Sequence, residues 1–145
     1  MKKTVLVILM LLFGCTTAKS GNVDFSTLSR EDYAPGINGR INEVITDPVS
    51  FDEFWKKIYR GMEDIPDVPK VDFAEKMVIA VSPGVMMTGG YDIEIVKVED
   101  KESRLEVTIL VERPTGAVTQ ALTQPHHIIE LEKKYIPVVY KWVER

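Results

Sequence analysis

The side chains that could carry chemistry are few, and the most telling of them is Cys15, the only cysteine in the sequence. It follows two lysines near the N-terminus, an apolar run over residues 5–13 and a glycine, and a polar stretch begins directly after it. This order is typical of a secretion signal. The apolar run is too short to cross a bilayer, which needs about 20 residues. We therefore expect residues 1–14 to be a cleaved signal peptide and Cys15 to become the mature N-terminus.

The adjacent pair His126 and His127 is the one place where a metal site or acid-base chemistry could begin. Neighbouring residues on a β-strand point to opposite faces, so the two imidazoles are not expected to converge on one ion. The acidic residues Glu94, Glu106 and Glu112 alternate with apolar residues, which is typical of a solvated sheet face rather than a catalytic pair.

Sequence motifs for catalysis or cofactor binding do not occur. There is no Gly-x-Ser-x-Gly elbow, no P-loop and no dinucleotide fingerprint. If Cys15 is lipidated, no thiol remains for catalysis, for a metal or for a disulfide. We therefore expect a protein that is not an enzyme, with no catalytic residues, no metal site and no cofactor.

The charge balance bears on possible partners. The full chain has 18 basic and 22 acidic residues; loss of Lys2 and Lys3 with the signal leaves 16 against 22, a net charge of −6. A negative chain is unsuited to binding nucleic acid or anionic lipid. We expect no nucleic-acid partner.

The apolar pattern predicts the elements that position these residues. Residues 15–35 are polar and lack periodicity, so we expect Cys15 to begin a flexible tether, with one globular domain at 36–145. Ser50 and Glu53 have the spacing of a capping box. Large apolar residues then follow on one helical face that should cover a sheet: Phe51, Phe54, Trp55, Ile58 and Tyr59.

The rest of the domain is predicted to be almost entirely β. Strands are expected at residues 36–46, 77–81, 91–99, 105–113, 127–132 and 138–143. The alternation changes phase between Ile95 and Val96, which predicts a β-bulge or a strand covered on both faces. The expected fold class is α+β: a single, mainly antiparallel and possibly curled sheet with one packed helix, preceded by the lipoprotein signal peptide and the tether.

Two stretches resemble known sequence families. Residues 12–15, Leu-Phe-Gly-Cys, resemble the lipobox of bacterial lipoproteins, which implies that Cys15 carries acyl chains such as palmitate and anchors the protein to a membrane. The alternative is an ordinary signal peptide with an accidental cysteine. Because residue 16 is Thr rather than the Asp of many inner-membrane lipoproteins, an outer-membrane or cell-surface location is favoured.

The second resemblance is in the globular part. Residues 83–95 contain a Gly, a short spacer, Thr-Gly-Gly-Tyr and an alternating strand, and residues 71–73, Pro114 and residues 122–129 add ordered matches. Over residues 71–142 this resembles the PrcB C-terminal domain family, which is named for a lipoprotein component of a secreted protease complex.

The resemblance implies an accessory subunit that binds or stabilises an exported protease or another envelope protein. A protease inhibitor or a small-ligand-binding lipoprotein is the alternative, and an enzyme is the third hypothesis. The loop formed by Met86, Met87, Thr88, Gly89, Gly90 and Tyr91 is the candidate partner-binding site. Its two glycines also have a purely architectural interpretation, as positions of positive φ at a close approach.

Overall fold

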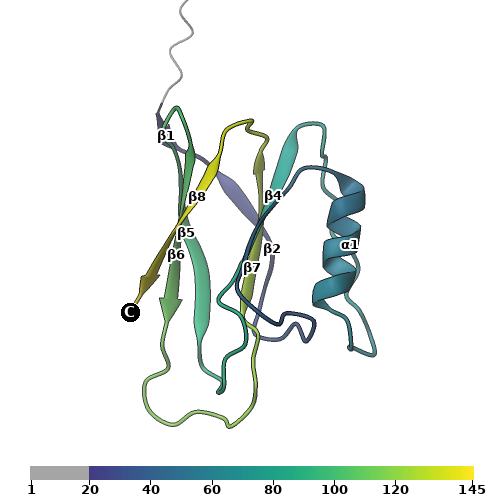
Figure 1. The fold of residues 1–145 in the computed structure, drawn as a ribbon, viewed down its shortest axis with the longest axis vertical. Helices are drawn as coiled ribbons and strands as arrows, with labels where there is room; N and C mark the ends of the chain where they lie inside the picture. Colours follow the sequence, from purple (N-terminus) through teal and green to yellow (C-terminus); the bar gives the residue numbers. More distant parts are fainter. Residues whose placement is uncertain (1–19) are drawn as a thin grey trace, which may run out of the picture.

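Residues 20–145 are described by the computed structural model of the chain (Figure 1), and they form eight strands and one helix. The predicted signal peptide at residues 1–14, the lipidation of Cys15 and the first part of the tether lie outside the described residues. The elements are β1 (Gly21–Asn22), β2 (Phe25–Glu31), β3 (Ile41–Ile45), α1 (Pro48–Ile58), β4 (Lys76–Ser82), β5 (Asp92–Asp100), β6 (Leu105–Glu112), β7 (His126–Glu132) and β8 (Val138–Glu144).

The strands form two sheets rather than the single sheet that the sequence predicts. One sheet has the order β1-β5-β6-β8 and the other the order β2-β7-β4-β3, and α1 packs on the outer face of the second (Figure 1). The reason lies in the central strands β4 and β7, which are buried on both faces. One face packs against the first sheet and the other against α1, so the α+β class holds with three layers.

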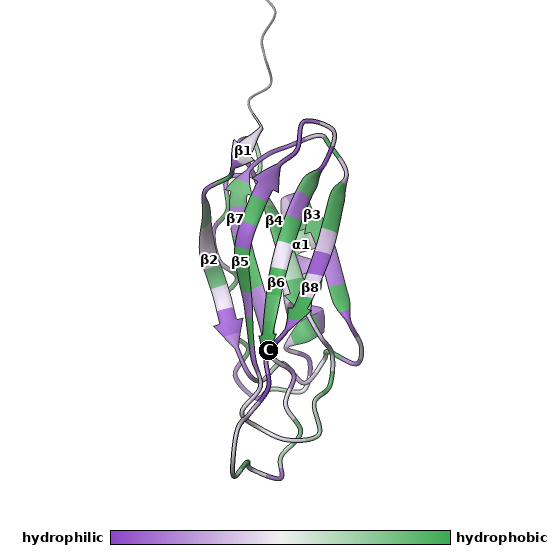
Figure 2. Cartoon of the chain, turned by 90° about the vertical axis from the view of Figure 1, so that its left-hand side faces the viewer, coloured by the Kyte–Doolittle hydropathy of each residue, from purple (hydrophilic) through white to green (hydrophobic). Residues whose placement is uncertain are grey.

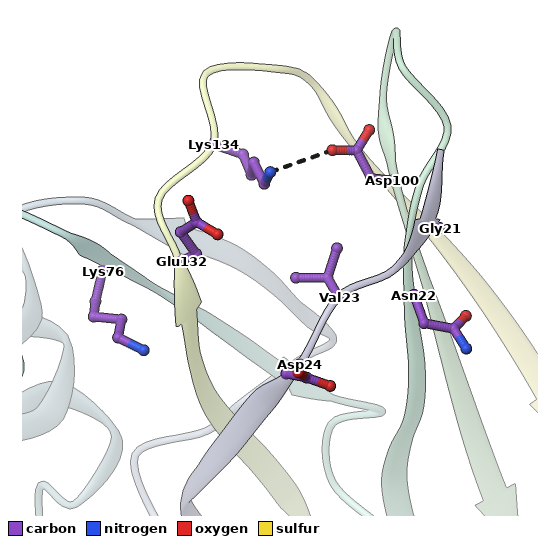
Figure 3. Close-up of a pocket in the computed structure, with 8 residues that line it drawn as sticks. All are labelled: Gly21, Asn22, Val23, Asp24, Lys76, Asp100, Glu132 and Lys134. Atoms are coloured by element: carbon purple, nitrogen blue, oxygen red, sulfur yellow. Dashed lines mark ion pairs between the residues drawn. The ribbon is translucent and has the colours of Figure 1, made fainter. Parts of the chain in front are cut away.

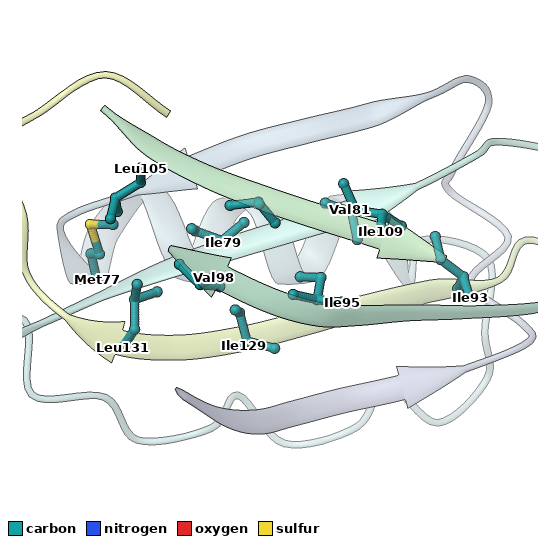
Figure 4. Packing of buried hydrophobic residues seen from close by; sticks show 11 residues of the cluster. Met77, Ile79, Val81, Ile93, Ile95, Val98, Leu105, Ile109, Ile129 and Leu131 are labelled. Carbon is teal, nitrogen blue, oxygen red and sulfur yellow. The ribbon is translucent and has the colours of Figure 1, made fainter. Parts of the chain in front are cut away.

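The core between the sheets is made of aliphatic side chains that alternate along the strands (Figure 4). Its members are Met77, Ile79 and Val81 of β4, Ile93, Ile95 and Val98 of β5, Leu105, Val107 and Ile109 of β6, and Ile129 and Leu131 of β7. Tyr140 and Trp142 of β8 pack against its margin on the same side of their strand, as their spacing predicts. Burial of this many branched side chains provides the main driving force for pairing the two sheets.

The helix packs its aromatic stripe on the second sheet, as predicted. Phe51, Trp55 and Tyr59 are buried, and the Trp55 indole nitrogen donates to the carbonyl of Pro66 at 2.7 Å. The cap differs from the expected Ser50: the backbone N–H of Ser50 donates to the carboxylate of Asp47 at 2.9 Å. Pro48 explains the earlier start, because proline has no N–H to satisfy and its fixed φ suits the first turn.

The predicted tether is wrong over residues 20–31, which form β1 and β2. β1 pairs with the end of β5, and β2 pairs with β7 as an edge strand. Phe25 and Val23 pack on the core between the sheets, whereas Leu28 packs on the helix side. The serine and threonine content that predicts a tether belongs here to a sheet edge with one solvated side.

Two details of strand pairing concern the predictions for β5 and β8. The register of β5 against β6 shifts between Ile95 and Lys97, where the sequence predicts a bulge. β8 pairs in parallel with β6, whereas every other pair is antiparallel. The first predicted strand is shorter than expected: residue 36 is in a turn, and β3 begins only at Ile41. Within residues 20–145, no helix has the length and apolar content that crossing a bilayer requires.

Candidate functional site

Two loops meet at the end of the sandwich opposite residue 20 (Figure 1): residues 83–91 between β4 and β5, and residues 113–125 between β6 and β7. A short antiparallel bridge joins them, with the Met86 N–H donating to the Thr123 carbonyl at 2.8 Å and the return bond at 3.0 Å. The Thr123 hydroxyl also donates to the carbonyl of Thr88 at 3.0 Å. The bridge therefore joins two loops whose paired residues are 37 positions apart in the sequence.

The two glycines of the Thr-Gly-Gly-Tyr stretch have the architectural role that the sequence suggests. Gly90 has a φ of +86°, and a Cβ there would lie 2.8 Å from the Cβ of Pro114. A Cβ on Gly89 would meet the hydroxyl of Thr119, whose carbonyl accepts the Gly89 N–H at 3.1 Å. Positive φ and Pro114 therefore exclude a side chain at position 90, whereas a side chain at position 89 would have to displace the Thr119 hydroxyl.

The other four residues of the predicted partner-binding loop differ in how exposed their side chains are. The Met87 side chain is 75% exposed, whereas Met86, Thr88 and Tyr91 are half-buried. Met87 and Leu122 directly adjoin the bridged residues Met86 and Thr123 on the two loops. Leu122 is 54% exposed, and Val85, on the other side of Met86 in the sequence, is 39% exposed. We call Val85, Met87 and Leu122 the distal loop face.

Sequence reasoning identified only Met87 of these three as a contact residue. Leu122 belongs to the second stretch of the family resemblance, but nothing in the sequence predicts that the next residue, Thr123, pairs with Met86, 37 positions earlier. The exposure of Val85 likewise depends on that pairing. The available signal was the presence of apolar residues in loops rich in Gly, Pro and Thr, where a packed core is not expected.

The histidine pair is separated as predicted, one ring on each side of β7. His126 Nε2 lies 3.0 Å from the Ser29 hydroxyl and 3.1 Å from the Tyr59 hydroxyl, on the helix side. His127 is on the side of the first sheet, where its Nδ1 accepts the Ile95 N–H at 2.8 Å. Among residues 20–145, no three His, Cys, Asp or Glu side chains are arranged to hold a metal ion.

Both imidazoles are held neutral by burial. Burial lowers the pKa of His126, and burial together with the nearby Arg30 lowers the pKa of His127 to about 4. The Ser29 hydroxyl next to His126 resembles a nucleophile beside a base, but it also lies 3.1 Å from the Tyr59 hydroxyl. The three groups satisfy one another's hydrogen bonds inside the layer between sheet and helix, which is a packing role.

The strand carboxylates lie on the outer face of the first sheet, which Figure 2 shows as a mixture of polar and apolar residues. Each meets a different arginine: Glu94 lies 3.3 Å from Arg30, Glu106 lies 3.7 Å from Arg104, and Glu112 pairs with Arg145. No two of these three share an arginine, and each is part of an ion pair on the sheet surface.

A pocket of about 350 Å³ opens at the other end of the molecule, beside β1 (Figure 3). Its charged lining consists of Asp24, Lys76, Asp100, Glu132 and Lys134, and Lys134 is 3.4 Å from Asp100. Sites for small organic ligands are mostly apolar with a few polar groups. This lining, in which charged side chains predominate, gives little support to the small-ligand alternative.

Comparison with known protein families gives a match over residues 77–132 to the family described as PrcB C-terminal. The matched region runs from β4 to β7 and includes both loops of the distal loop face. No curated protein and no solved structure matches the chain.

Proposed function

Residues 77–132 form a PrcB C-terminal domain, and from this premise we propose that the protein is a lipid-anchored envelope protein without enzymatic activity that binds a partner protein through its distal loop face. The partner is an exported protease or another envelope protein, as the family resemblance implies. The observation that carries the proposal is that two exposed apolar side chains, Met87 and Leu122, lie next to the bridged residues Met86 and Thr123 on loops joined by that backbone bridge.

The chemistry of this face suits a protein partner. Exposed apolar side chains gathered on one surface are typical of protein interfaces. Methionine is flexible and polarizable, so it adapts to different apolar surfaces. The underlying glycines and the bridge hold the backbone in one conformation, which reduces the entropy lost on binding.

The position of the anchor supports the same arrangement. Only four residues separate Cys15 from Ser20, and an extended chain covers at most about 18 Å in five steps. The Ser20 hydroxyl donates to the Asp100 carbonyl at the β1 end of the sandwich. A lipid on Cys15 would therefore hold the β1 end near the membrane and leave the distal loop face free for a partner.

Co-purification from detergent-solubilised envelopes tests the loop face. The double variant Met87→Ser, Leu122→Ser should lose the partner that wild type retains, and its stability should change little because both side chains are exposed. The matched control removes two exposed apolar side chains elsewhere, Tyr135→Ser with Val139→Ser, and should keep the partner. Equal recovery of the partner by both double variants would refute the proposed interface.

The anchor is tested separately. Wild-type protein should enter the detergent phase on phase separation, whereas Cys15→Ser should remain uncleaved or become water-soluble, since only the lipid fixes the mature chain. Wild-type protein found entirely in the aqueous phase would contradict the lipoprotein assignment without affecting the loop-face test.

The inhibitor alternative predicts a different effect on the same partner. If the co-purified protein is a protease, an accessory subunit should leave the rate of proteolysis unchanged or lengthen the lifetime of the protease. A dose-dependent fall in proteolysis on adding the purified full chain would favour an inhibitor, whose loops enter the protease cleft.

A further inference from the structure

β3 is an edge strand with an open side. Among residues 20–145 it pairs only with β4, from Ile41 opposite Ser82 to Ile45 opposite Val78. Asn42, Glu43 and Val44 at its centre are exposed. In an edge strand, alternate backbone N–H and C=O groups point away from the sheet and can pair with another chain.

The helix α1 forms a wall beside this open edge. Two pockets of about 280 and 340 Å³ lie between β3 and α1, and Glu43, Phe54 and Lys57 line both of them. The shared lining makes them one continuous groove, which we call the β3–α1 groove. Phe54, which the sequence places on the buried stripe, is only half-buried because it forms part of this groove.

The charges of the groove differ from one end to the other. Arg40 lines the end where β3 begins, and Lys57 lies between the two ends, where it lines both pockets. Glu53 lines the end where α1 begins, and Glu43 lies between the two. Within residues 20–145, none of these four side chains forms an ion pair. The groove therefore offers a basic end, an apolar centre at Phe54 and an acidic end.

We propose that the β3–α1 groove binds an extended peptide segment of a partner protein, which joins the second sheet as a fifth strand antiparallel to β3. Antiparallel pairing continues the pattern of this sheet, in which all three strand pairs are antiparallel. It sets the N-terminal side of the peptide beside Glu53 and the C-terminal side beside Arg40. The segment that fits carries a basic residue, then an apolar residue over Phe54, then an acidic residue, at alternate positions.

A second copy of the chain fits this edge less well. Antiparallel pairing of two β3 strands about a two-fold axis at their centre sets Glu43 directly opposite its copy. Like charges directly opposite one another destabilise a strand pair. The charge pattern therefore favours a peptide of complementary sequence over self-association.

The full-length protein in detergent micelles can be titrated with a labelled peptide, Ser-Lys-Thr-Leu-Thr-Glu-Ser. Its Lys, Leu and Glu should face Glu53, Phe54 and Arg40. Fluorescence polarisation should show saturable binding, and amide shifts in NMR spectra should centre on Val44 and Lys57. A peptide with Lys and Glu exchanged should bind about five- to tenfold more weakly, since two attractive charge pairs become repulsive.

Two controls isolate the groove and the backbone pairing. Lys57→Glu should weaken binding by a similar factor, whereas Lys56→Glu on the neighbouring exposed position should change it less than about twofold. Alternate backbone nitrogens of the peptide can be methylated in two ways, on the odd-numbered or on the even-numbered residues. One of these two peptides should fail to bind, because its methyl groups replace the N–H groups that pair with β3.

Several results would overturn the proposal: equal affinity for the charge-exchanged peptide, shifts centred on β8, or no binding at millimolar peptide. Concentration-dependent dimerisation that Glu43→Lys abolishes would assign the edge to self-association instead. The variant Met87→Ser, Leu122→Ser should bind the peptide normally, so failure here and failure of the distal loop face can be told apart.

Discussion

His127 connects the two sheets through a single ring. Its Nδ1 accepts the N–H of Ile95 in β5, so Nδ1 carries no proton and Nε2 donates to the Thr27 hydroxyl at 2.8 Å. The bond to Ile95 falls beside the bulge of β5, where the strand pairing is interrupted. Protonation of Nδ1 would remove the acceptor and place a charge in the core between the sheets.

The stability of the domain should therefore depend on pH in a defined direction. The pKa of His127 is lowered from 6.5 to about 4, so below pH 6.5 the unfolded chain takes up a proton that the folded chain does not. Urea unfolding should show stability falling by up to about 3 kcal/mol between pH 6.5 and 4. His127→Gln should flatten this slope, and an unchanged slope would mean that the ring is not held neutral.

Gly90 gives a second prediction for a single residue. Gly90→Ala should cost more than about 1 kcal/mol, because positive φ strains any side chain and the new Cβ meets Pro114. Gly116 also has positive φ but open space around it, so Gly116→Ala isolates the strain alone at about 1 kcal/mol. Gly39→Ala, with neither constraint, should stay within about 0.5 kcal/mol. Equal losses at all three positions in urea melts would contradict this order.

The placement of an individual residue could be predicted from the sequence where local backbone geometry determines it. The opposite faces of His126 and His127 follow from strand alternation alone, and the need for glycine at position 90 follows from its loop context. The contact of His127 with Ile95 and the bridge of Met86 with Thr123 depend on which strands and loops lie side by side. Those contacts join residues more than 30 positions apart, and single-sequence patterns carry no information on them.

Among the elements, α1 provides the sharpest test of packing. The Trp55 side chain is 2% exposed, and its ring centroid lies 5.8 Å from that of Phe51 in an edge-to-face arrangement. Trp55→Ala should destabilise the domain by about 3 to 5 kcal/mol, the usual range for a buried large aromatic. Lys56→Ala on the exposed side should change stability by less than about 0.5 kcal/mol. A Trp55→Ala loss below about 1 kcal/mol would show that the stripe is not core.

The elements themselves were predicted better than their assembly. The helix, the bulge and the strands from β4 to β8 follow from apolar periodicity and turn residues. The second sheet was missed because β4 and β7 carry apolar residues on both faces, and the sequence does not say whether a helix or another sheet covers each face. β2 was missed because an edge strand with one solvated side has the composition of a tether.

At the scale of the whole molecule, the sandwich has two unlike ends. Residue 20 and the charged pocket lie at one end, and the distal loop face lies at the other (Figure 1). Strands of seven to nine residues between these ends correspond to about 25 to 30 Å. The net charge of −6 that the chain would have without residues 1–14 disfavours contact of the body with anionic lipid. A lipid on Cys15 should therefore hold the domain upright, with the loops away from the bilayer.

Lipid-phase quenching can measure this orientation, because Cys15 is the only cysteine in the sequence and its thiol would carry the lipid in the proposed lipoprotein. A fluorophore on Tyr135→Cys, a position 89% exposed near the β1 end, should be quenched by nitroxide-labelled lipid in anionic vesicles. The same fluorophore on Met87→Cys, also highly exposed, should be quenched much less, because it lies a further sandwich length away. If the short anchor alone sets the orientation, raising the salt concentration should not change the ratio of quenching at the two labels. If charge repulsion holds the body upright, added salt should bring both labels closer to the bilayer. Equal quenching at both positions in low salt would mean that the domain lies on its side, with the distal loop face no better placed for a partner than the rest of the surface.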